Sequence, residues 1–487
     1  MISLKNLVHD AYPDRPFLVL IPDIPVKSIE CDSRKVEKGF VFVAICGTRQ
    51  DGNAFVEEAI RRGAAAVVAD RAAAVPPTIP FILVPDARIA AARLADVFYS
   101  HPSRKMKLVG ITGTNGKTTT SFLIEHMLRG ERQNVGLIGT VNYHFAGKEI
   151  PAAETTPGPL RLQALLSQMC ENLCDHVVLE VSAHAIDQNR TAGIHFQSAL
   201  FTNLTRDHLD YFESLENYFN CKARFFTSLS EDQAAVLNQD DPRVRTLKEK
   251  TRARVITFGI ENPADLKAEV VESDLKNTRF RLHWPRGEIF VEIPLVGLHN
   301  VYNALGALAV MQSLGFDLAA AAGHLSDFKG VPGRLERVDR GQNFSVFVDY
   351  AHTPDGLENV LRSLKPYKKG KLITLFGCGG DRDRGKRPLM AKIASGYSDF
   401  VVITSDNPRS EDPRDIAAEI QAGFPGGFKD YVSTLDRKKA IRQTLLMARE
   451  NDIVLLAGKG HETTQVVGNE TLPFSDQEEA ERVLDGR

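Results

Sequence analysis

The chain has 487 residues, which is too long for one ordinary hydrophobic core and favours about three domains. Its 43% hydrophobic and 25% charged residues are typical of a globular protein, and a net charge of -2 gives no general attraction to nucleic acid or to an anionic membrane. Residues 1–10 lack the pattern of an export signal, and no apolar run is long enough to span a membrane. We therefore expect a cytoplasmic protein whose anion-binding sites are local.

Six cysteines are spread along the chain without a Cys-x-x-Cys pair or the spacing of a disulfide framework. Reduced and mostly buried thiols are therefore expected. The cysteines are Cys31, Cys46, Cys170, Cys174, Cys221 and Cys378.

The first part of the chain alternates apolar runs of strand length with amphipathic stretches of helix length. Strands are predicted at residues 40–45, 65–69 and 81–84, and helices at 54–62 and 88–99. The segment His101-Pro102-Ser103 interrupts this alternation. We therefore predict a first domain that ends near residue 101.

The same alternation continues in two further blocks, which predicts mostly parallel sheets. Strands are predicted at residues 107–111, 176–181, 199–203, 345–348, 371–376, 400–404 and 453–457. The segment Gly330–Gly333 predicts a hinge between the two blocks. The expected fold is an α/β protein of three domains, with a central parallel-sheet domain and a doubly wound C-terminal domain. The expected bounds are 1–101, 102–333 and 334–487.

A variant phosphate-binding loop follows the strand predicted at residues 107–111. It has the Gly-Lys-Thr of the usual pattern, with Ile111 in place of the earlier glycine. Such a loop turns backbone N–H groups toward an anion, a lysine reaches the outer phosphates, and a threonine hydroxyl can bind Mg²⁺. A glycine-rich turn without a ligand is the alternative, but the strand–loop–helix context favours an ATPase domain. The expected ATP-binding residues are Gly113, Thr114, Asn115, Gly116, Lys117, Thr118 and Thr119.

Two more predicted strands carry polar groups at their carboxyl ends. Glu180 ends an apolar strand beside the phosphate loop, where a carboxylate can hold Mg²⁺; a helix cap is the alternative. His208 follows the next strand and could serve a second metal, although a lone histidine is more often structural. Because Glu180 and Thr118 are expected near it, a metal role for His208 is favoured.

Three strands of the last block end in polar loops, at residues 377–387, 406–409 and 458–462. Loops at the carboxyl ends of strands in an open α/β sheet share one crevice. Arginines such as Arg382 and Arg409 could each bind a carboxylate, and Asp406 or Glu462 could hold an ammonium. A zwitterionic amino acid would fit these groups. A nucleic-acid surface is disfavoured because the chain is nearly neutral and the basic loop has no interleaved aromatic residues.

The run Thr112–Thr119 resembles the superfamily of Mur ligases and folylpolyglutamate synthetases, and the remaining motifs narrow the resemblance to the Mur ligase family. The run Asp406–Arg409 is similar to the signature of the branch that adds meso-diaminopimelate, whose extra carboxylate Arg409 can pair. The resemblance covers essentially the whole chain. It implies an ADP-forming amide ligase that joins meso-diaminopimelate to UDP-MurNAc-L-Ala-D-Glu through an acyl phosphate, for peptidoglycan synthesis.

The resemblance also implies metal chemistry at Lys222, which taken alone would be an ordinary surface lysine. The matching lysine of the family carries a carbamate made from CO₂ and helps to position a second Mg²⁺. The implied catalytic residues are Lys117, Glu180, His208 and carbamylated Lys222, and the implied metal set is Thr118, Glu180, His208 and Lys222.

Three substrate sites are implied in the same way. The nucleotide site adds His299, Asn303, Arg334 and Asp349 to the phosphate loop. The UDP-MurNAc-dipeptide site is implied to include Cys31, Ser33, Thr48, Arg49, Gln50, Thr155, Thr156, Ser182, Gln188 and Arg190. The diaminopimelate site is implied to include Arg382, Asp406, Asn407, Pro408, Arg409, Gly458 and Glu462. Glu154 and Ala183 depart from the family pattern, which often has asparagine and serine there.

Two other functions remain open from the sequence. A folylpolyglutamate synthetase would share the phosphate loop, but it gives no reason for a UDP-binding first domain or for the Asp406–Arg409 run. A nucleotide-dependent switch protein would require the three strand-end loops to be unrelated. The expected partners are therefore small-molecule substrates, with no nucleic acid and no membrane span, and the expected state is a monomer.

Overall fold

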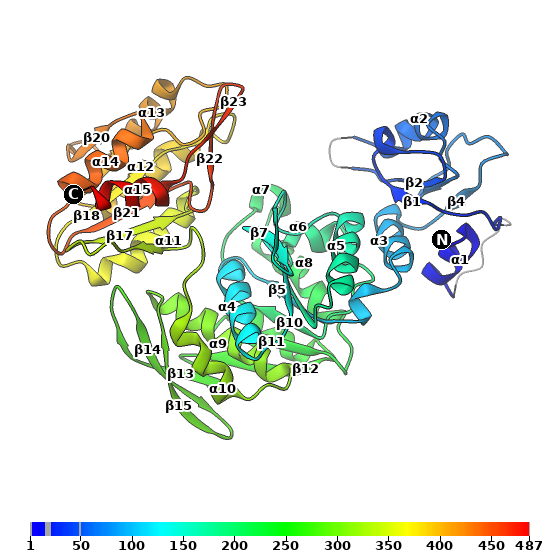
Figure 1. Cartoon of the computed structure of the whole chain (residues 1–487), viewed down its shortest axis with the longest axis horizontal. Coiled ribbons are helices and arrows are strands. Elements are labelled where there is room, and N and C mark those ends of the chain that lie inside the picture. Colours follow the sequence, from blue (N-terminus) through cyan, green and yellow to red (C-terminus); the bar gives the residue numbers. More distant parts are fainter. Residues whose placement is uncertain (1, 15–20, 48–49, 487) are drawn as a thin grey trace. The chain divides into compact units, whose positions relative to one another are not determined.

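The computed structural model describes residues 2–14, 21–47 and 50–486 of the chain. It contains two compact units, of which the first comprises residues 1–267 and 303–324 and the second comprises residues 268–302 and 325–487. Each unit is built on mostly parallel sheets with helices, so the predicted α/β class is confirmed (Figure 1).

The first unit begins with a small parallel sheet in the order β1-β2-β3-β4. These strands are β1 (Ser28–Glu30), β2 (Phe40–Ala44), β3 (Ala66–Ala69) and β4 (Phe81–Leu83). Alternate residues point to opposite faces, so Val41 and Val43 pack with helices α1 (Leu4–Ala11) and α3 (Ala87–Phe98), whereas Phe42 and Ala44 pack with α2 (Val56–Arg61). The helix predicted at residues 54–62 starts later because residues 52–55 form a 3₁₀ turn capped by Asp51.

A larger sheet follows in the first unit, in the order β12-β11-β10-β5-β9-β6-β7-β8. Its strands are β5 (Lys107–Thr112), β6 (Val135–Ile138), β7 (Asn142–Phe145), β8 (Lys148–Pro151), β9 (His176–Glu180), β10 (Ser198–Phe201), β11 (Ala234–Asn238) and β12 (Arg254–Gly259). The strands from β12 to β6 run parallel, and β7 and β8 form an antiparallel edge. The associated helices are α4 (Lys117–Gly130), α5 (Pro159–Glu171), α6 (Ala183–Asp187), α7 (Leu209–Phe212), α8 (Leu215–Thr227) and α10 (Leu318–Gly323).

Strand β5 lies at the point where the order of strand addition in this sheet reverses. After β5 the chain continues to β6 on one side of it, and after β9 it crosses to β10 on the other side. Ligands of open α/β sheets bind outside the carboxyl ends of the strands at such a switch point. The loops that follow β5, β9 and β10 are therefore the place to look for chemistry in this unit.

The second unit contains a sheet in the order β16-β17-β21-β18-β19-β20. These strands are β16 (Glu336–Val338), β17 (Ser345–Asp349), β18 (Leu372–Phe376), β19 (Phe400–Ile403), β20 (Tyr431–Ser433) and β21 (Ile453–Ala457), and only β16 runs antiparallel to its neighbour. Helices α11 (Pro354–Leu364), α12 (Lys386–Tyr397) and α13 (Pro413–Gln421) cover one face, and α14 (Arg437–Met447) and α15 (Asp476–Asp485) cover the other (Figure 1). The doubly wound arrangement is thus confirmed.

Two hairpins were not predicted from the sequence. Strands β14 (Thr278–Trp284) and β15 (Gly287–Ile293) form one antiparallel hairpin, and β22 (Thr464–Val467) and β23 (Glu470–Pro473) form the other. The remaining strand is β13 (Leu266–Ser273), and the remaining α-helix is α9 (Leu298–Ser313), among the described residues. In the described residues, no helix combines the length and the apolar character that crossing a bilayer requires.

His176, the first residue of β9, makes the stability of the first unit sensitive to acid. The side chain is 2% exposed, its ring lies 5.8 Å from that of Phe316, and neither ring nitrogen has a hydrogen-bond partner in the described structure. Burial lowers the pKa of His176 from its ordinary 6.5 to about 4. Between about pH 4 and pH 6.5, this histidine is therefore protonated in the unfolded chain and neutral in the folded chain.

We expect His176→Leu to flatten the loss of stability between pH 7 and pH 5. Stability contributed by a neutral buried histidine falls as pH drops toward its folded pKa, by about 2 kcal/mol over this interval. Urea unfolding of both proteins at the two pH values measures the difference. Equal losses in the wild type and the variant would show that His176 is protonated without penalty.

Candidate functional site

The phosphate loop connects β5 to α4 at the switch point of the large sheet. Gly113 and Gly116 have φ values of +144° and +86°, a region that favours glycine. A Cβ atom at Gly113 would collide with the hydroxyl of Thr202, and one at Gly116 would collide with the side chain of Asn303. The predicted strand–loop–helix context is present, and Asn303 lies against the loop as the resemblance implies.

The lysine of the loop folds back over its own backbone. Nζ of Lys117 donates to the carbonyl oxygens of Gly113 and Thr114 at 2.9 and 2.8 Å. An anion bound in the loop offers a stronger acceptor than either carbonyl, because hydrogen bonds to charged oxygens are about twice as strong as neutral ones. Lys117 is therefore held where an incoming phosphate can capture it.

The Glu180 carboxylate, at the end of β9, gathers hydroxyl groups beside the loop. It is fully buried, and it accepts from the hydroxyl of Thr118 at 3.1 Å and from the hydroxyl of Thr140 at 2.9 Å. The backbone N–H of Thr140 donates to its other oxygen at 3.0 Å. A buried carboxylate beside threonine hydroxyls is the hard oxygen donor set that Mg²⁺ prefers, so these residues fit that ion.

Lys222 on α8 lies beneath the phosphate loop and is only 1% exposed. Its Nζ donates to the carbonyl of Gly113 at 3.0 Å and to the hydroxyl of Thr112 at 3.2 Å, and it lies 4.7 Å from the centre of the Tyr218 ring. Burial, and then the nearby positive charge of Lys117, holds the pKa of Lys222 well below its usual range. Its burial and its lowered pKa distinguish Lys222 from an ordinary surface lysine.

His208 is the fourth implied metal residue. It directly precedes α7 in a left-handed conformation with φ +53°, and its side chain is 46% exposed. Its ring lies 4.9 Å from that of His184 and 6.2 Å from that of Tyr218. No group of three or more acidic, histidine or cysteine side chains is placed to hold a metal in the ranges that the structure describes.

The residues implied to hold the MurNAc-peptide form one hydrogen-bonded network after β9. The hydroxyl of Thr156 donates to the carbonyl of Glu180 at 2.7 Å and accepts from the N–H of Ser182 at 3.0 Å. Arg190 donates to the carbonyl of Thr156 at 2.7 Å and to the side chain of Gln188 at 2.9 Å. Thr155 joins this network through the hydroxyl of Thr140, 3.1 Å away.

Glu154, one of the two departures from the family pattern, has a definite partner. Its carboxylate accepts a hydrogen bond from Arg190 at 2.7 Å, with the glutamate side chain 50% exposed and the arginine 16% exposed. The other departure, Ala183, is buried in the apolar core where α6 begins.

Only part of the implied UDP site can be described. Ser33 is buried, and its hydroxyl donates to Glu58 at 2.8 Å, whereas Cys31 is half-buried and Gln50 is exposed. Thr48 and Arg49 lie outside the described residues.

The six cysteines are free thiols, three of them buried and three half-buried.

In the second unit, Asp349 at the end of β17 and Arg334 lie close together. The Asp349 carboxylate accepts from the N–H groups of Leu335 and Ala351 at 2.7 and 2.8 Å. Burial raises the pKa of Asp349 above its ordinary value, although Arg334 and these hydrogen bonds oppose the shift. The Arg334 guanidinium lies 5.5 Å from the centre of the Tyr350 ring. His299, at the start of α9, lies near Ser363, with Nδ1 3.3 Å from the hydroxyl oxygen.

The three strand-end loops of the second unit do converge. Arg409 has φ +51° and donates to the carbonyl of Gly380 at 2.8 Å, which joins the loops after β18 and β19. Asn407 donates to Glu462 at 2.9 Å, which joins the loops after β19 and β21. A Cβ atom at Gly458 would lie 2.8 Å from a carboxylate oxygen of Asp406, so the last two loops touch.

Lys459 was not singled out from the sequence. It is fully buried and donates to Glu462 at 2.8 Å and to the side-chain oxygen of Asn407 at 3.2 Å. The Glu462 carboxylate therefore already has a cationic partner, unlike the free carboxylate that the sequence suggested. The signal available in the sequence was a lysine between two glycines directly after a buried strand.

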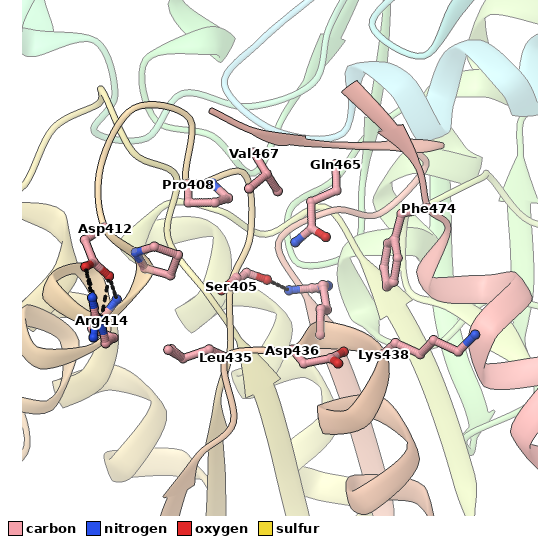
Figure 2. Close-up of a pocket in the computed structure, with 12 residues that line it drawn as sticks. Ser405, Pro408, Asp412, Arg414, Leu435, Asp436, Lys438, Gln465, Val467 and Phe474 are labelled. Carbon is pink, nitrogen blue, oxygen red and sulfur yellow. Dashed lines mark hydrogen bonds and ion pairs between the residues drawn. The ribbon is translucent and has the colours of Figure 1, made fainter. Parts of the chain in front are cut away.

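Arg382 and Pro408 lie outside this network. Arg382 is exposed and donates to the carbonyl of Asp381 at 3.2 Å. Pro408 lines a cavity of about 470 Å³ between the β22 hairpin and the start of α14 (Figure 2). Figure 2 shows Pro408 and Val467 on one side of this cavity and Asp436 and Lys438 on the other. Arg382, Arg409 and Glu462 do not line this cavity.

Comparisons with known proteins agree along the whole chain. The family models for the Mur ligase family catalytic domain, the Mur ligase middle domain, and the Mur ligase glutamate ligase domain match residues 25–99, 111–311 and 333–460. The chain is 46% identical to the UDP-N-acetylmuramoyl-L-alanyl-D-glutamate–2,6-diaminopimelate ligase of Geobacillus thermodenitrificans, over 94% of each chain.

Solved structures show the same similarity. A structure of a UDP-N-acetylmuramoyl-L-alanyl-D-glutamate–2,6-diaminopimelate ligase is 33% identical with a TM-score of 0.73, over 100% of this chain and 99% of that one. The folylpolyglutamate synthase of Mycobacterium tuberculosis is 20% identical with a TM-score of 0.61, over 76% of this chain and 92% of that one, which shows a shared fold alone. By sequence and by structure, the chain belongs to the Mur ligase family.

Proposed function

We propose that this chain is an ADP-forming amide ligase that joins meso-diaminopimelate to UDP-MurNAc-L-Ala-D-Glu during peptidoglycan synthesis. The observation that carries the proposal is the convergence of the Asp406–Arg409 loop with the loops after β18 and β21, in a chain that also carries a phosphate loop. Full-length similarity to proteins named for this reaction supports it. The proposed site of action is the cytoplasm, and the proposed state is a monomer.

The three parts of the chain then have separate tasks. Residues 1–101 would bind the UDP-bearing substrate, residues 102–333 would bind ATP, and residues 334–487 would bind the amino acid. Bound substrates would be brought together by closure about the Gly330–Gly333 segment, as in other enzymes in which domain closure completes the site.

The reaction begins with phosphoryl transfer. The γ-carboxylate of the D-glutamyl residue attacks the γ-phosphorus of ATP, which forms an acyl phosphate and releases ADP. Lys117 neutralises negative charge that spreads over the transferring group, and the backbone N–H groups of the loop hold the remaining phosphates. The network of Thr156 and Arg190 would orient the D-glutamyl carboxylate. The position of this network directly after Glu180 supports that role.

The second step forms the amide. The free amine of diaminopimelate attacks the acyl carbon, phosphate leaves with the bonding electron pair, and the amine nitrogen loses a proton. The side chains proposed to hold the amino acid are Arg382, Asp406, Asn407, Arg409 and Glu462, with Pro408 and Gly458 shaping the loops. No covalent bond to the enzyme forms in either step.

The proposed metal ligands are Thr118, Glu180, His208 and Lys222, with the last as a carbamate. Bound Mg²⁺ would supply positive charge to the phosphate oxygens during transfer. Only a neutral amine adds to CO₂, and burial of Lys222 near the positive charge of Lys117 lowers its pKa and so favours that form. Addition of CO₂, with loss of a proton, would turn that amine into an anionic carbamate beside the phosphate loop. The nucleotide would also contact His299, Asn303, Arg334 and Asp349.

An acceptor competition assay tests the proposal. ADP release is measured with UDP-MurNAc-L-Ala-D-Glu and ATP while meso-diaminopimelate, L-lysine or L-glutamate is offered. We expect turnover with diaminopimelate and little with the other two, because lysine lacks the second carboxylate and glutamate lacks the second amine that such a site pairs. Turnover with lysine alone would contradict the assigned acceptor. In a parallel assay with a folate in place of UDP-MurNAc-L-Ala-D-Glu, turnover with glutamate would favour the folylpolyglutamate alternative.

A further inference from the structure

A fully buried ion pair in the second unit lies directly behind the acceptor loops. Arg437 is the first residue of α14 and Asp476 is the first residue of α15, and both side chains are 0% exposed. Two hydrogen bonds join them, from Nε to Oδ1 at 2.7 Å and from Nη2 to Oδ2 at 2.5 Å. The carboxylate therefore fixes the plane and the direction of the guanidinium.

The remaining donors of Arg437 bind two backbone carbonyls at the carboxyl ends of β19 and β21, the two strands that flank β18. Nη1 donates to the carbonyl of Ser405, after β19, at 3.2 Å, and Nη2 donates to the carbonyl of Ala457, the last residue of β21, at 3.0 Å. The next residue after Ser405 is Asp406, and the next after Ala457 is Gly458. One rigid side chain thus holds the starting points of two acceptor loops.

A contribution to the stability of the fold does not by itself explain why this ion pair is buried here. Removing two charges from water costs about as much as their attraction returns, and well-packed apolar residues of similar size are often equally stable. A planar guanidinium differs from an apolar residue because it donates hydrogen bonds in fixed directions. The two carbonyls that it reaches belong to the loops that touch at Gly458 and Asp406.

We propose that Arg437, oriented by Asp476, is a positioning residue that sets the spacing between the Asp406–Arg409 loop and the Gly458–Glu462 loop. It touches no substrate, and it acts through the backbone of these loops. The inference rests on the proposed function, since it assigns the two loops to the amino acid acceptor. Loss of this spacing weakens acceptor binding and leaves the phosphate loop, which belongs to the other unit, unaffected.

The test compares steady-state kinetics of the full chain between the wild type and variants of this ion pair. Arg437→Met leaves the Asp476 charge buried and unpaired, so the informative variant is the double substitution Arg437→Met with Asp476→Leu, which keeps an apolar pair of similar size. We expect this variant to keep its melting temperature within a few degrees while the KM for diaminopimelate rises about 10- to 100-fold, the usual effect of removing a group that orients a site residue. The KM for ATP should stay within about 2-fold. Arg437→Lys, which keeps the charge and some donors, should recover part of the KM.

Ile441→Ala provides the matched control on the same helix. Ile441 is fully buried in the core cluster against α14 and contacts neither loop through hydrogen bonds. This substitution should lower the melting temperature and leave the KM for diaminopimelate unchanged. A folded double variant with wild-type KM, or an equal rise of KM in the Ile441→Ala control, would overturn the inference.

The proposed function and this inference fail in different ways. If the wild type uses another amino acid, the acceptor assignment is wrong, and the KM for that amino acid is measured in the same variants. If the wild type uses diaminopimelate and the double variant keeps its KM, only the positioning role of Arg437 is wrong.

Discussion

Lys222→Ala should lower kcat about 1000-fold, because it removes the metal-binding carbamate proposed at this site, an anion expected to contribute several kcal/mol to the phosphoryl-transfer step. The KM values for UDP-MurNAc-L-Ala-D-Glu and diaminopimelate should change little. Added formate or acetate should restore part of the activity, since a small carboxylate can occupy the space of the lost carbamate beneath the phosphate loop. Measuring kcat with and without these acids tests both claims.

Two controls separate a carbamate from a simple structural lysine. Arg224→Ala changes an exposed side chain of the same helix, 53% accessible and paired with Asp187, and should leave kcat within about 2-fold of the wild type. A ¹³C spectrum recorded with labelled bicarbonate should contain a carbamate carbon in the wild type that is absent from Lys222→Ala. Activity in Lys222→Ala equal to that of the wild type, or no carbamate signal from the active wild type, would contradict the assignment.

Arg409→Ala should raise the KM for meso-diaminopimelate about 100- to 1000-fold, because truncating one partner of a desolvated charge pair costs 2–5 kcal/mol or more. The preference for diaminopimelate over lysine should shrink by a similar factor, since lysine never used that guanidinium. Competition between the two amino acids, followed by the mass of the product, measures the preference directly.

Arg414→Ala is the matched control for Arg409→Ala. Arg414 lies on α13, its side chain is 79% exposed, and it pairs with Asp412. Its replacement removes one positive charge near the same loop without touching it, so the KM for diaminopimelate should change less than about 2-fold. Equal effects of the two substitutions would mean that general charge, and no specific pairing by Arg409, sets the acceptor preference.

The strands that position these sites could be predicted because they are buried on both faces. Strand β21 was predicted at the residues where it occurs, and β17, β18 and β19 within one residue at each end. Buried parallel strands have continuous apolar runs, and polar loops mark their ends. The hairpins of β14 with β15 and of β22 with β23 have no such continuous apolar runs. Strands β14 and β15 bury only alternate residues, and β22 and β23 are partly or fully exposed along their length.

The site was predictable where a motif carries local geometry and unpredictable where distant segments meet. The phosphate loop needs only its own residues and the strand and helix beside it. The contacts of Lys222 depend on α8 packing beneath that loop, although its burial could have been expected because it lies on the apolar face of the helix, one turn from Tyr218 and Phe226. The pairing of Arg437 with Asp476, 39 residues apart in the sequence, likewise depends on tertiary packing.

Because Arg190 already pairs with Glu154, a ligand carboxylate that binds this arginine competes with an existing partner. Any carboxylate that engages Arg190 must displace one that already lies 2.7 Å away, so the process is an exchange between two anions. The net gain is the difference between two similar contacts, and it is small by comparison with capture by an unoccupied cation. Arg190 would therefore contribute more to selecting a ligand by its shape than to the affinity for that ligand.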